Sequence, residues 1–110
     1  MLYIIGLGLN KNSITEEGKQ ALKKCKKIYL ENYTVKFPYS QNTLEKSLKR
    51  KLISLGREKV ESDFLISEAK KQNIALLVYG SPLFATTHTT ILEDCQEAKI
   101  KTKIIFNSSI

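Results

Sequence analysis

The sequence predicts an α/β domain: a five-stranded, mainly parallel sheet with helices on both faces. Three observations predict this fold class. Five short apolar runs alternate with four stretches of helical spacing, which is the element order of a parallel, doubly covered sheet. Residues 74–79 are apolar without interruption, as expected of a strand buried on both faces. The chain has 110 residues, enough for one core and one domain.

The predicted strands are short apolar runs, and glycine or polar residues follow each of them. They cover residues 2–5, 28–30, 52–55, 74–79 and 103–106. The third run is the least regular, and Gly56 marks its end.

The first helix follows a polar stretch in which Ser13 and Thr15 are alternative N-caps. Four small or apolar residues predict one buried stripe, because they follow the i, i+3, i+4, i+7 spacing of a helix. They are Gly18, Ala21, Leu22 and Cys25.

Three more helices are expected. Asn42 and Glu45 resemble a capping box, which predicts that the second helix opens there and continues through Leu48. The third helix is expected over about 60–71, with Phe64 and Leu65 among its buried residues, and the fourth over about 87–98.

The positive charge is expected to collect at helix ends. The chain carries 18 basic and 11 acidic residues, a formal charge of +7. Lysines close the predicted helices and acidic residues open most of them, which complements the helix dipoles. Helices of a parallel sheet end where strands begin, whereas ligands bind where strands end, so the basic surface should face away from the ligand. Since arginine reads phosphates and bases and only two cations are arginines, no direct nucleic-acid partner is expected.

The two cysteines are expected to be reduced packing residues. Cys25 and Cys95 are 70 positions apart, and neither has a cysteine or histidine near it in a metal-binding pattern. The longest apolar run, at residues 2–9, is far shorter than the ~20 residues of a bilayer span. We therefore expect a cytoplasmic protein with no metal site and no membrane partner.

Glycine and polar residues follow four of the predicted strands. Parallel strands bring such segments together at one edge of the sheet. Glycine at positions 6, 8 and 80 would let the main chain approach a ligand and bind it directly, which suits a cofactor containing a nucleoside. The segments are 6–9 (GLGL), 31–34 (ENYT), 80–82 (GSP) and 107–110 (NSSI).

Two common phosphate-binding patterns do not fit. The dinucleotide fingerprint needs a third glycine where the chain has Lys11, although Glu31 lies about where a ribose-binding acid would be expected. A Walker loop needs Gly-Lys followed by Ser or Thr, and the sequence has none.

In order and spacing, the motifs of this chain resemble those of the diphthine synthases, methyltransferases of the tetrapyrrole-methylase superfamily. The pattern Ala85-Thr-Thr-His88 after a Gly-x-Pro turn is more typical of this family than of its porphyrin-modifying relatives. The matching segments are LYIIGLGL at 2–9, Ile14-Thr15 with Gly18, IYLENYT at 28–34, Arg57-Glu58 with Val60-Glu61, GSPLFATTHT at 80–89 and NSSI at 107–110.

The resemblance implies an enzyme that uses S-adenosyl-L-methionine to methylate the amino group of a modified histidine on elongation factor 2, a step toward diphthamide. Family members have two α/β domains with the cofactor between them, and residues 1–110 correspond to the first, N-terminal one. We expect this domain to be inactive alone, with an exposed apolar face that meets a C-terminal domain or a second copy of the chain.

The resemblance also implies which residues contact the cofactor: Leu9, Ser81, Phe84, Ser109 and Ile110. At Ser81 the family usually has aspartate, so we expect weaker cofactor binding than a carboxylate would give. Tyr33 and Thr34 are candidates for lining the approach of the substrate.

No catalytic side chain is predicted, because an in-line transfer to an unprotonated amine depends mainly on positioning. His88, the single histidine, has no acid, Ser or Cys partner evident in the sequence, and we expect it to bond the loop main chain near a helix start. Two other functions remain open: a noncatalytic binding or assembly module that keeps the fold, and a porphyrinoid methyltransferase domain.

Overall fold

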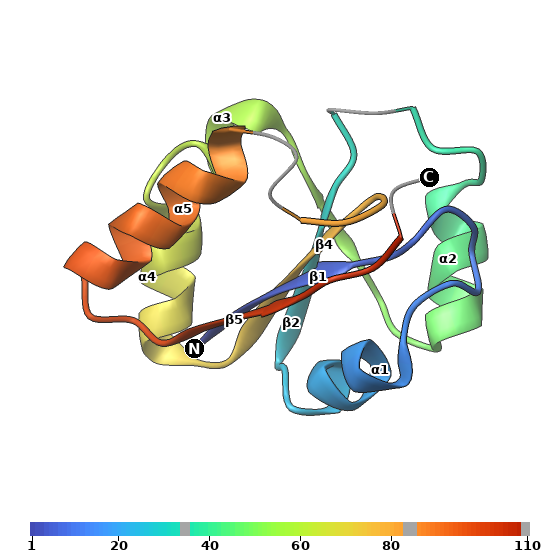
Figure 1. Cartoon of the computed structure of the whole chain (residues 1–110), viewed down its shortest axis with the longest axis horizontal. Helices are drawn as coiled ribbons and strands as arrows, with labels where there is room; N and C mark the ends of the chain where they lie inside the picture. Colours follow the sequence, from blue (N-terminus) through green and yellow to red (C-terminus); the bar gives the residue numbers. More distant parts are fainter. Residues whose placement is uncertain (34–35, 83–85, 109–110) are drawn as a thin grey trace.

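The computed structural model describes residues 1–33, 36–82 and 86–108. Five strands form one sheet: β1 (Leu2–Gly6), β2 (Lys27–Glu31), β3 (Ile53–Leu55), β4 (Ile74–Val78) and β5 (Thr102–Ile105). The helices are α1 (Glu16–Lys23), α2 (Gln41–Leu48), α3 (Arg57–Val60), α4 (Phe64–Lys71) and α5 (Thr86–Glu97). Figure 1 shows their arrangement around the sheet.

The strand order is β3-β2-β4-β1-β5, and every pairing is parallel. The fold class predicted from the sequence is therefore confirmed. All five residues of β4 and all five of β1 are buried, because these two strands have a neighbour on each side and helices on both faces. The uninterrupted apolar run at 74–78 is the sequence counterpart of this burial.

Alternate residues of each strand point to opposite faces and build two cores. In β1, Tyr3 and Ile5 pack with residues of α1 and α2, whereas Leu2 and Ile4 pack with residues of α3, α4 and α5. Figure 1 shows the same division, with α1 and α2 on one side of the sheet and the other helices across it.

The caps of the first two helices differ in how well the sequence predicts them. Thr15 caps α1, its hydroxyl accepting from the Gly18 N–H at 3.0 Å. The capping box at Asn42 and Glu45 is wrong: Ser40 caps α2 instead. The Glu45 carboxylate accepts from the Leu52 N–H at 2.8 Å, so it satisfies a donor just before β3 rather than one at the helix start.

The single helix expected over 60–71 is interrupted. Residues 61–63 form a turn between α3 and α4, in which the Ser62 hydroxyl donates to the Lys59 carbonyl at 2.7 Å and accepts from the Phe64 N–H at 3.1 Å. A serine that bonds its own main chain in this way competes with the helical ladder, which is why the helix stops and restarts.

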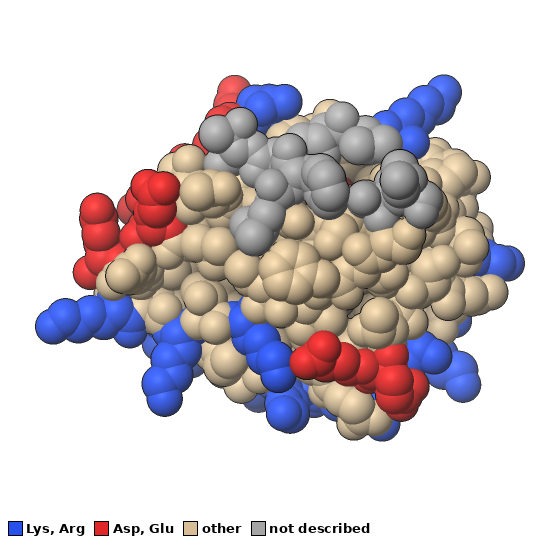
Figure 2. All heavy atoms as spheres, in the orientation of Figure 1, with Lys and Arg blue, Asp and Glu red and all other residues tan. Residues whose placement is uncertain are grey.

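Basic side chains gather at the edge of the sheet where the strands begin, as the sequence predicts. The Lys26 N–H donates to the Asn73 carbonyl, and the Leu2 N–H to the Lys101 carbonyl, so strand starts and helix ends meet here. Figure 2 shows basic side chains along the lower border, where α1 and the start of β2 lie in Figure 1. The exposed lysines of this edge are Lys23, Lys24, Lys26, Lys27, Lys49, Lys51, Lys70, Lys71, Lys99 and Lys101.

Two other expectations concern burial. Cys25 and Cys95 are buried free thiols, as predicted. The expected apolar face is not formed by the described residues: Ile53 and Phe106 are the large hydrophobic side chains exposed there, and they lie at opposite edges of the sheet. Among the helices described, none has the length and apolarity needed to cross a bilayer.

Candidate functional site

The glycine bends after β1 and β4 meet where the strands end. Gly8 and Gly80 each donate the main-chain N–H to the carbonyl of the other, at 3.0 and 2.9 Å. Both have positive φ angles, 72° and 73°, which glycine adopts without steric cost. The predicted convergence of these bends is therefore confirmed. We call this edge of the sheet the rim, made of residues 7–10, 31–33, 56–57, 79–82 and 106–108.

The space beside Gly6 and Gly8 is filled by the chain itself, so these two glycines leave no open room for a ligand. A Cβ built on Gly6 would lie 2.7 Å from the Gly80 carbonyl oxygen, and one on Gly8 would lie 2.5 Å from the Cβ of Ser13. The N–H and carbonyl groups of Gly8 and Gly80 are also used in their mutual pairing. These contacts shape the rim, and the approach of its main chain to a ligand stays a prediction.

Asn107, the second residue after β5, ties the end of β1, the segment before α1 and the bend after β4 together. Its side-chain amide donates to the carbonyls of Gly6 and Ser13, at 3.1 and 2.9 Å. Its main-chain N–H donates to the Ser81 hydroxyl at 3.1 Å. The sequence predicts that Asn107 lies at this edge of the sheet, but it does not reveal these contacts. An amide side chain directly after a strand, opposite two glycine bends, is the signal that could have identified it.

Two of the predicted cofactor contacts, Leu9 and Ser81, lie on the adjacent bends that Gly8 and Gly80 lock together. Within the described residues, neither the Leu9 N–H nor the Ser81 N–H donates a hydrogen bond. The Leu9 carbonyl is held by the Tyr79 hydroxyl at 2.9 Å. N–H donors on two paired bends fit a ligand that carries carboxylate or hydroxyl oxygens, such as an amino acid joined to a nucleoside.

The remaining predicted contacts, Phe84, Ser109 and Ile110, lie outside the described residues, as does Thr34. Tyr33, the other residue expected near the substrate, is described and lies half-buried on the rim. The structure thus places Leu9 and Ser81 on paired bends. The contacts expected from Phe84, Ser109 and Ile110 stay predictions.

His88 and Glu31 form a buried pair at the rim. The Nε2 atom of His88 lies 2.6 Å from Oε2 of Glu31, and their side chains are 4% and 1% exposed. This acidic partner differs from the main-chain bond that we expect for His88 from the sequence. Oε2 of Glu31, the candidate for a ribose-binding acid, is therefore engaged by His88, and the carboxylate is buried. The two residues are 57 positions apart, so no local pattern reveals the pair.

Arg57 is an exposed cation of the rim. Its guanidinium lies 4.9 Å from the centre of the Tyr33 ring and 3.9 Å from the Glu61 carboxylate. A guanidinium over an aromatic face is a favourable cation–π contact. The planar group therefore stands beside the end of β2, where it can meet an anionic group of a substrate.

An aromatic group supports the bend that carries Leu9. Phe37 packs against Tyr39 and Tyr79 with ring centres 5.5 and 5.2 Å apart. Burial is the main reason that the pKa of Tyr39 is raised to about 12, so its hydroxyl stays protonated. Phe37 and Tyr39 also line a hollow of about 170 Å³ beside the end of β2.

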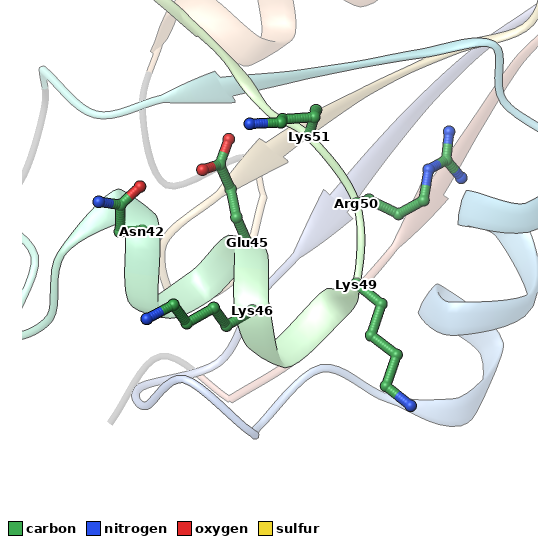
Figure 3. Close-up of a pocket in the computed structure, with 6 residues that line it drawn as sticks. All are labelled: Asn42, Glu45, Lys46, Lys49, Arg50 and Lys51. Carbon is green, nitrogen blue, oxygen red and sulfur yellow. The ribbon is translucent and has the colours of Figure 1, made fainter.

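A larger hollow, about 360 Å³, lies outside the rim around the second half of α2. Figure 3 shows Lys46 and Lys49 extending from the helix, while Arg50 turns away toward α1. The Arg50 guanidinium donates to two carbonyls at and just after the end of α1, those of Leu22 and Cys25, at 2.7 and 2.9 Å. This arginine caps a helix end, and neither Leu9 nor Ser81, the two described cofactor contacts, lines the hollow.

Comparisons with known proteins agree on one family. The family described as Tetrapyrrole (Corrin/Porphyrin) Methylases matches residues 1–107. The chain is 45% identical to diphthine methyl ester synthase 2 of Candida albicans, and the match covers the whole chain and 38% of that relative. It is 42% identical to the diphthine synthase of Methanothermobacter thermautotrophicus, covering the whole chain and 43% of that relative.

A solved structure is also similar. A crystal structure of diphthine synthase superposes with a TM-score of 0.94 and 35% identity, covering 99% of this chain and 45% of that one. The chain therefore spans less than half the length of these relatives.

Proposed function

The chain belongs to the tetrapyrrole methylase family, and from this premise we propose that it forms the N-terminal part of an S-adenosyl-L-methionine-dependent diphthine synthase. The proposed substrate is the modified histidine of elongation factor 2. Such a translation factor works in the cytoplasm, where we also place this protein. The observation that carries the proposal is the pair of adjacent rim bends, on which the N–H groups of Leu9 and Ser81 donate to no group among residues 1–33, 36–82 and 86–108.

The main-chain N–H groups of Leu9 and Ser81 suit the binding of S-adenosyl-L-methionine. Bound there, this cofactor would supply a methyl group on a positively charged sulfur. The N–H groups would bind its polar atoms, and Asn107 and Tyr79 would keep the two bends in place. Phe84, Ser109 and Ile110 complete the proposed set of contacts.

The atom that accepts the methyl group is either an amine nitrogen or a carboxylate oxygen of the substrate. Transfer to the amine breaks the bond between sulfur and the methyl carbon, and the unprotonated nitrogen forms the new bond. Several relatives are named diphthine methyl ester synthases, and a methyl ester forms on a carboxylate oxygen. The exposed guanidinium of Arg57 would suit a carboxylate near Tyr33.

The relatives are more than twice as long as the 110 residues of this chain. We therefore propose that the chain is active only together with a C-terminal domain like the one that completes these relatives. The test mixes four components: the chain, a candidate C-terminal domain, cofactor labelled in the methyl group, and unmodified elongation factor 2. We expect label on elongation factor 2 from the mixture and none from either part alone. Mild base would release the label from a methyl ester but not from a methylated amine.

The same experiment separates this function from the alternatives. A noncatalytic module would bind its partner without transferring label. A porphyrinoid methyltransferase would label a tetrapyrrole and leave elongation factor 2 unlabelled. Absence of label on elongation factor 2, with a correctly folded mixture, would reject the proposal.

A further inference from the structure

The buried pair of Glu31 and His88 is not explained by stability alone. Removing a carboxylate from water is costly, and a well-packed apolar pair of similar size is often equally stabilising or more so. Both side chains are nevertheless almost fully buried, with their closest atoms 2.6 Å apart. A contact of this type has one favourable geometry, so it can set the position of the segments that carry it.

The segments that the pair joins belong to opposite parts of the proposed site. Glu31 is the last residue of β2, two positions before Tyr33, which lies beside Arg57. His88 is the third residue of α5, seven positions after Ser81. The pair thus connects the side expected to receive the substrate with the segment expected to hold the cofactor.

We call the residues from Gly80 to the start of α5 the cofactor segment. Its first residues, Gly80 and Ser81, are already held by other contacts. Gly80 pairs with Gly8 on β1's side of the sheet, and Ser81 accepts from the Asn107 N–H. These contacts set the segment against β1 and β5, while His88 sets the start of α5 against β2. The pairing of Leu30 with Leu77 already places the start of the segment beside β2. The contact of His88 with Glu31 adds a second fixed point, where the segment enters α5.

We propose that Glu31 and His88 are positioning residues, which set the cofactor segment relative to the substrate side of the rim. This inference rests on the proposed function. Neither residue touches the reacting atoms in this role. A displacement of about 1 Å between donor and acceptor can cost about 100-fold in rate, so the pair should affect the transfer step more than binding.

The main test is a double variant, Glu31→Met with His88→Phe, assayed in the mixture with the C-terminal domain. Two apolar side chains of similar size should keep the domain folded while removing the directional contact. We expect kcat to fall about 100-fold, with KM for elongation factor 2 changed less than threefold. Wild-type kcat in this variant would overturn the proposal.

Two further variants separate position from charge and from stability. Glu31→Gln keeps an oxygen acceptor at the same place, so it should retain more of kcat than Glu31→Met alone. Tyr29→Phe removes the 2.8 Å bond between Tyr29 and Glu68, elsewhere on the same strand, and serves as the matched control. It should lower the melting temperature and leave kcat within twofold. If Tyr29→Phe and the double variant lost kcat equally, the Glu31–His88 pair would contribute only to stability and would not position the segment.

A measurement without catalysis keeps the inference apart from the proposed function. Amide hydrogen exchange of the chain alone reports how firmly the start of α5 is held. In the double variant we expect faster exchange at residues 88–92, with the rest of the sheet unchanged. Unchanged exchange there would overturn the positioning role. If the wild-type mixture transfers no label, the proposed function fails, while the exchange result still decides this inference.

Discussion

The hydroxyl of Ser81 accepts a hydrogen bond from the main-chain N–H of Asn107 at 3.1 Å. The contact joins the bend after β4 to the residues after β5, across the position of β1, which lies between them in the sheet. Ser81 is 6% exposed, so its hydroxyl is part of the support of the rim as well as a candidate ligand contact. Substitutions at either residue therefore test the shape of the rim and its chemistry separately.

Asn107→Ala should destabilise the protein by about 1–3 kcal/mol, because the two hydrogen bonds that its amide donates are lost, together with the one that its oxygen accepts from the Ser108 N–H. The carbonyls of Gly6 and Ser13 would lose their donor in a partly buried place. Urea unfolding checks this value. Asn73→Ala is the matched control, since that amide makes a long, exposed bond of 3.4 Å to Lys24, and it should change stability little. Equal effects of the two variants would contradict the role given to Asn107.

Ser81→Asp should strengthen the binding of S-adenosyl-L-methionine about tenfold, because a charged acceptor is worth more than a neutral one. An aspartate oxygen can also keep the bond from the Asn107 N–H. Titration calorimetry on the chain with its C-terminal domain measures the effect. Ser81→Ala, which removes that bond, should bind more weakly than wild type. Equal affinities of wild type and Ser81→Asp would show that the missing carboxylate does not matter.

Gly8→Ala should destabilise the protein by more than about 1–2 kcal/mol, the usual cost of a left-handed conformation for a residue with a Cβ. The new Cβ would also meet Ser13 Cβ at 2.5 Å. Gly56→Ala is the control, because its φ of −81° suits any residue and no atom lies within 4 Å of the new Cβ. Thermal unfolding should place Gly56→Ala close to wild type. If Gly8→Ala lowered the stability only slightly, the bend at Gly8 would be able to change its conformation to accept a Cβ.

The sheet was predictable because its signal is local. A buried parallel strand needs a continuous apolar run, and 74–78 shows one directly. The interruption at 61–63 was not predictable from periodicity, since apolar residues continue in helical spacing while Ser62 bonds its own main chain. The capping box failed for a similar reason: the pattern identifies a carboxylate near a helix start but not the distant N–H of Leu52 that it serves.

The site was predictable only in its location. Strand ends of a parallel sheet share one edge, so glycine and polar residues after strands were expected together there. The partners within that edge depend on contacts far apart in sequence. Glu31 and His88 are 57 positions apart, and Asn107 and Gly6 are 101 apart. Residue type could not show that Gly8 would bond Gly80 rather than a ligand.

The two thiols should be unreactive in the folded protein. Burial raises the pKa of Cys25 to about 11 and also raises that of Cys95, so the thiolate that attacks a disulfide reagent is scarce at about pH 8. An aromatic disulfide reagent should label neither cysteine in native buffer and both in urea. Fast labelling of one thiol without denaturant would show that its surroundings open.

Glu68 should give the protein stability that is lost in acid. A hydrogen bond from Tyr29, with help from Lys27, lowers the pKa of this carboxyl below its ordinary value. A group with a lower pKa in the folded state stabilises it above the unfolded pKa, about 4.3 for glutamate, and loses that effect as pH falls through the folded value. Wild type should therefore melt higher than Glu68→Gln near neutral pH, and the gap should narrow as the buffer is made acidic. Glu17→Gln is the control, because its partner Lys103 is exposed and the pair is 3.4 Å apart at the surface. A gap between wild type and Glu68→Gln that does not change with pH would contradict the prediction.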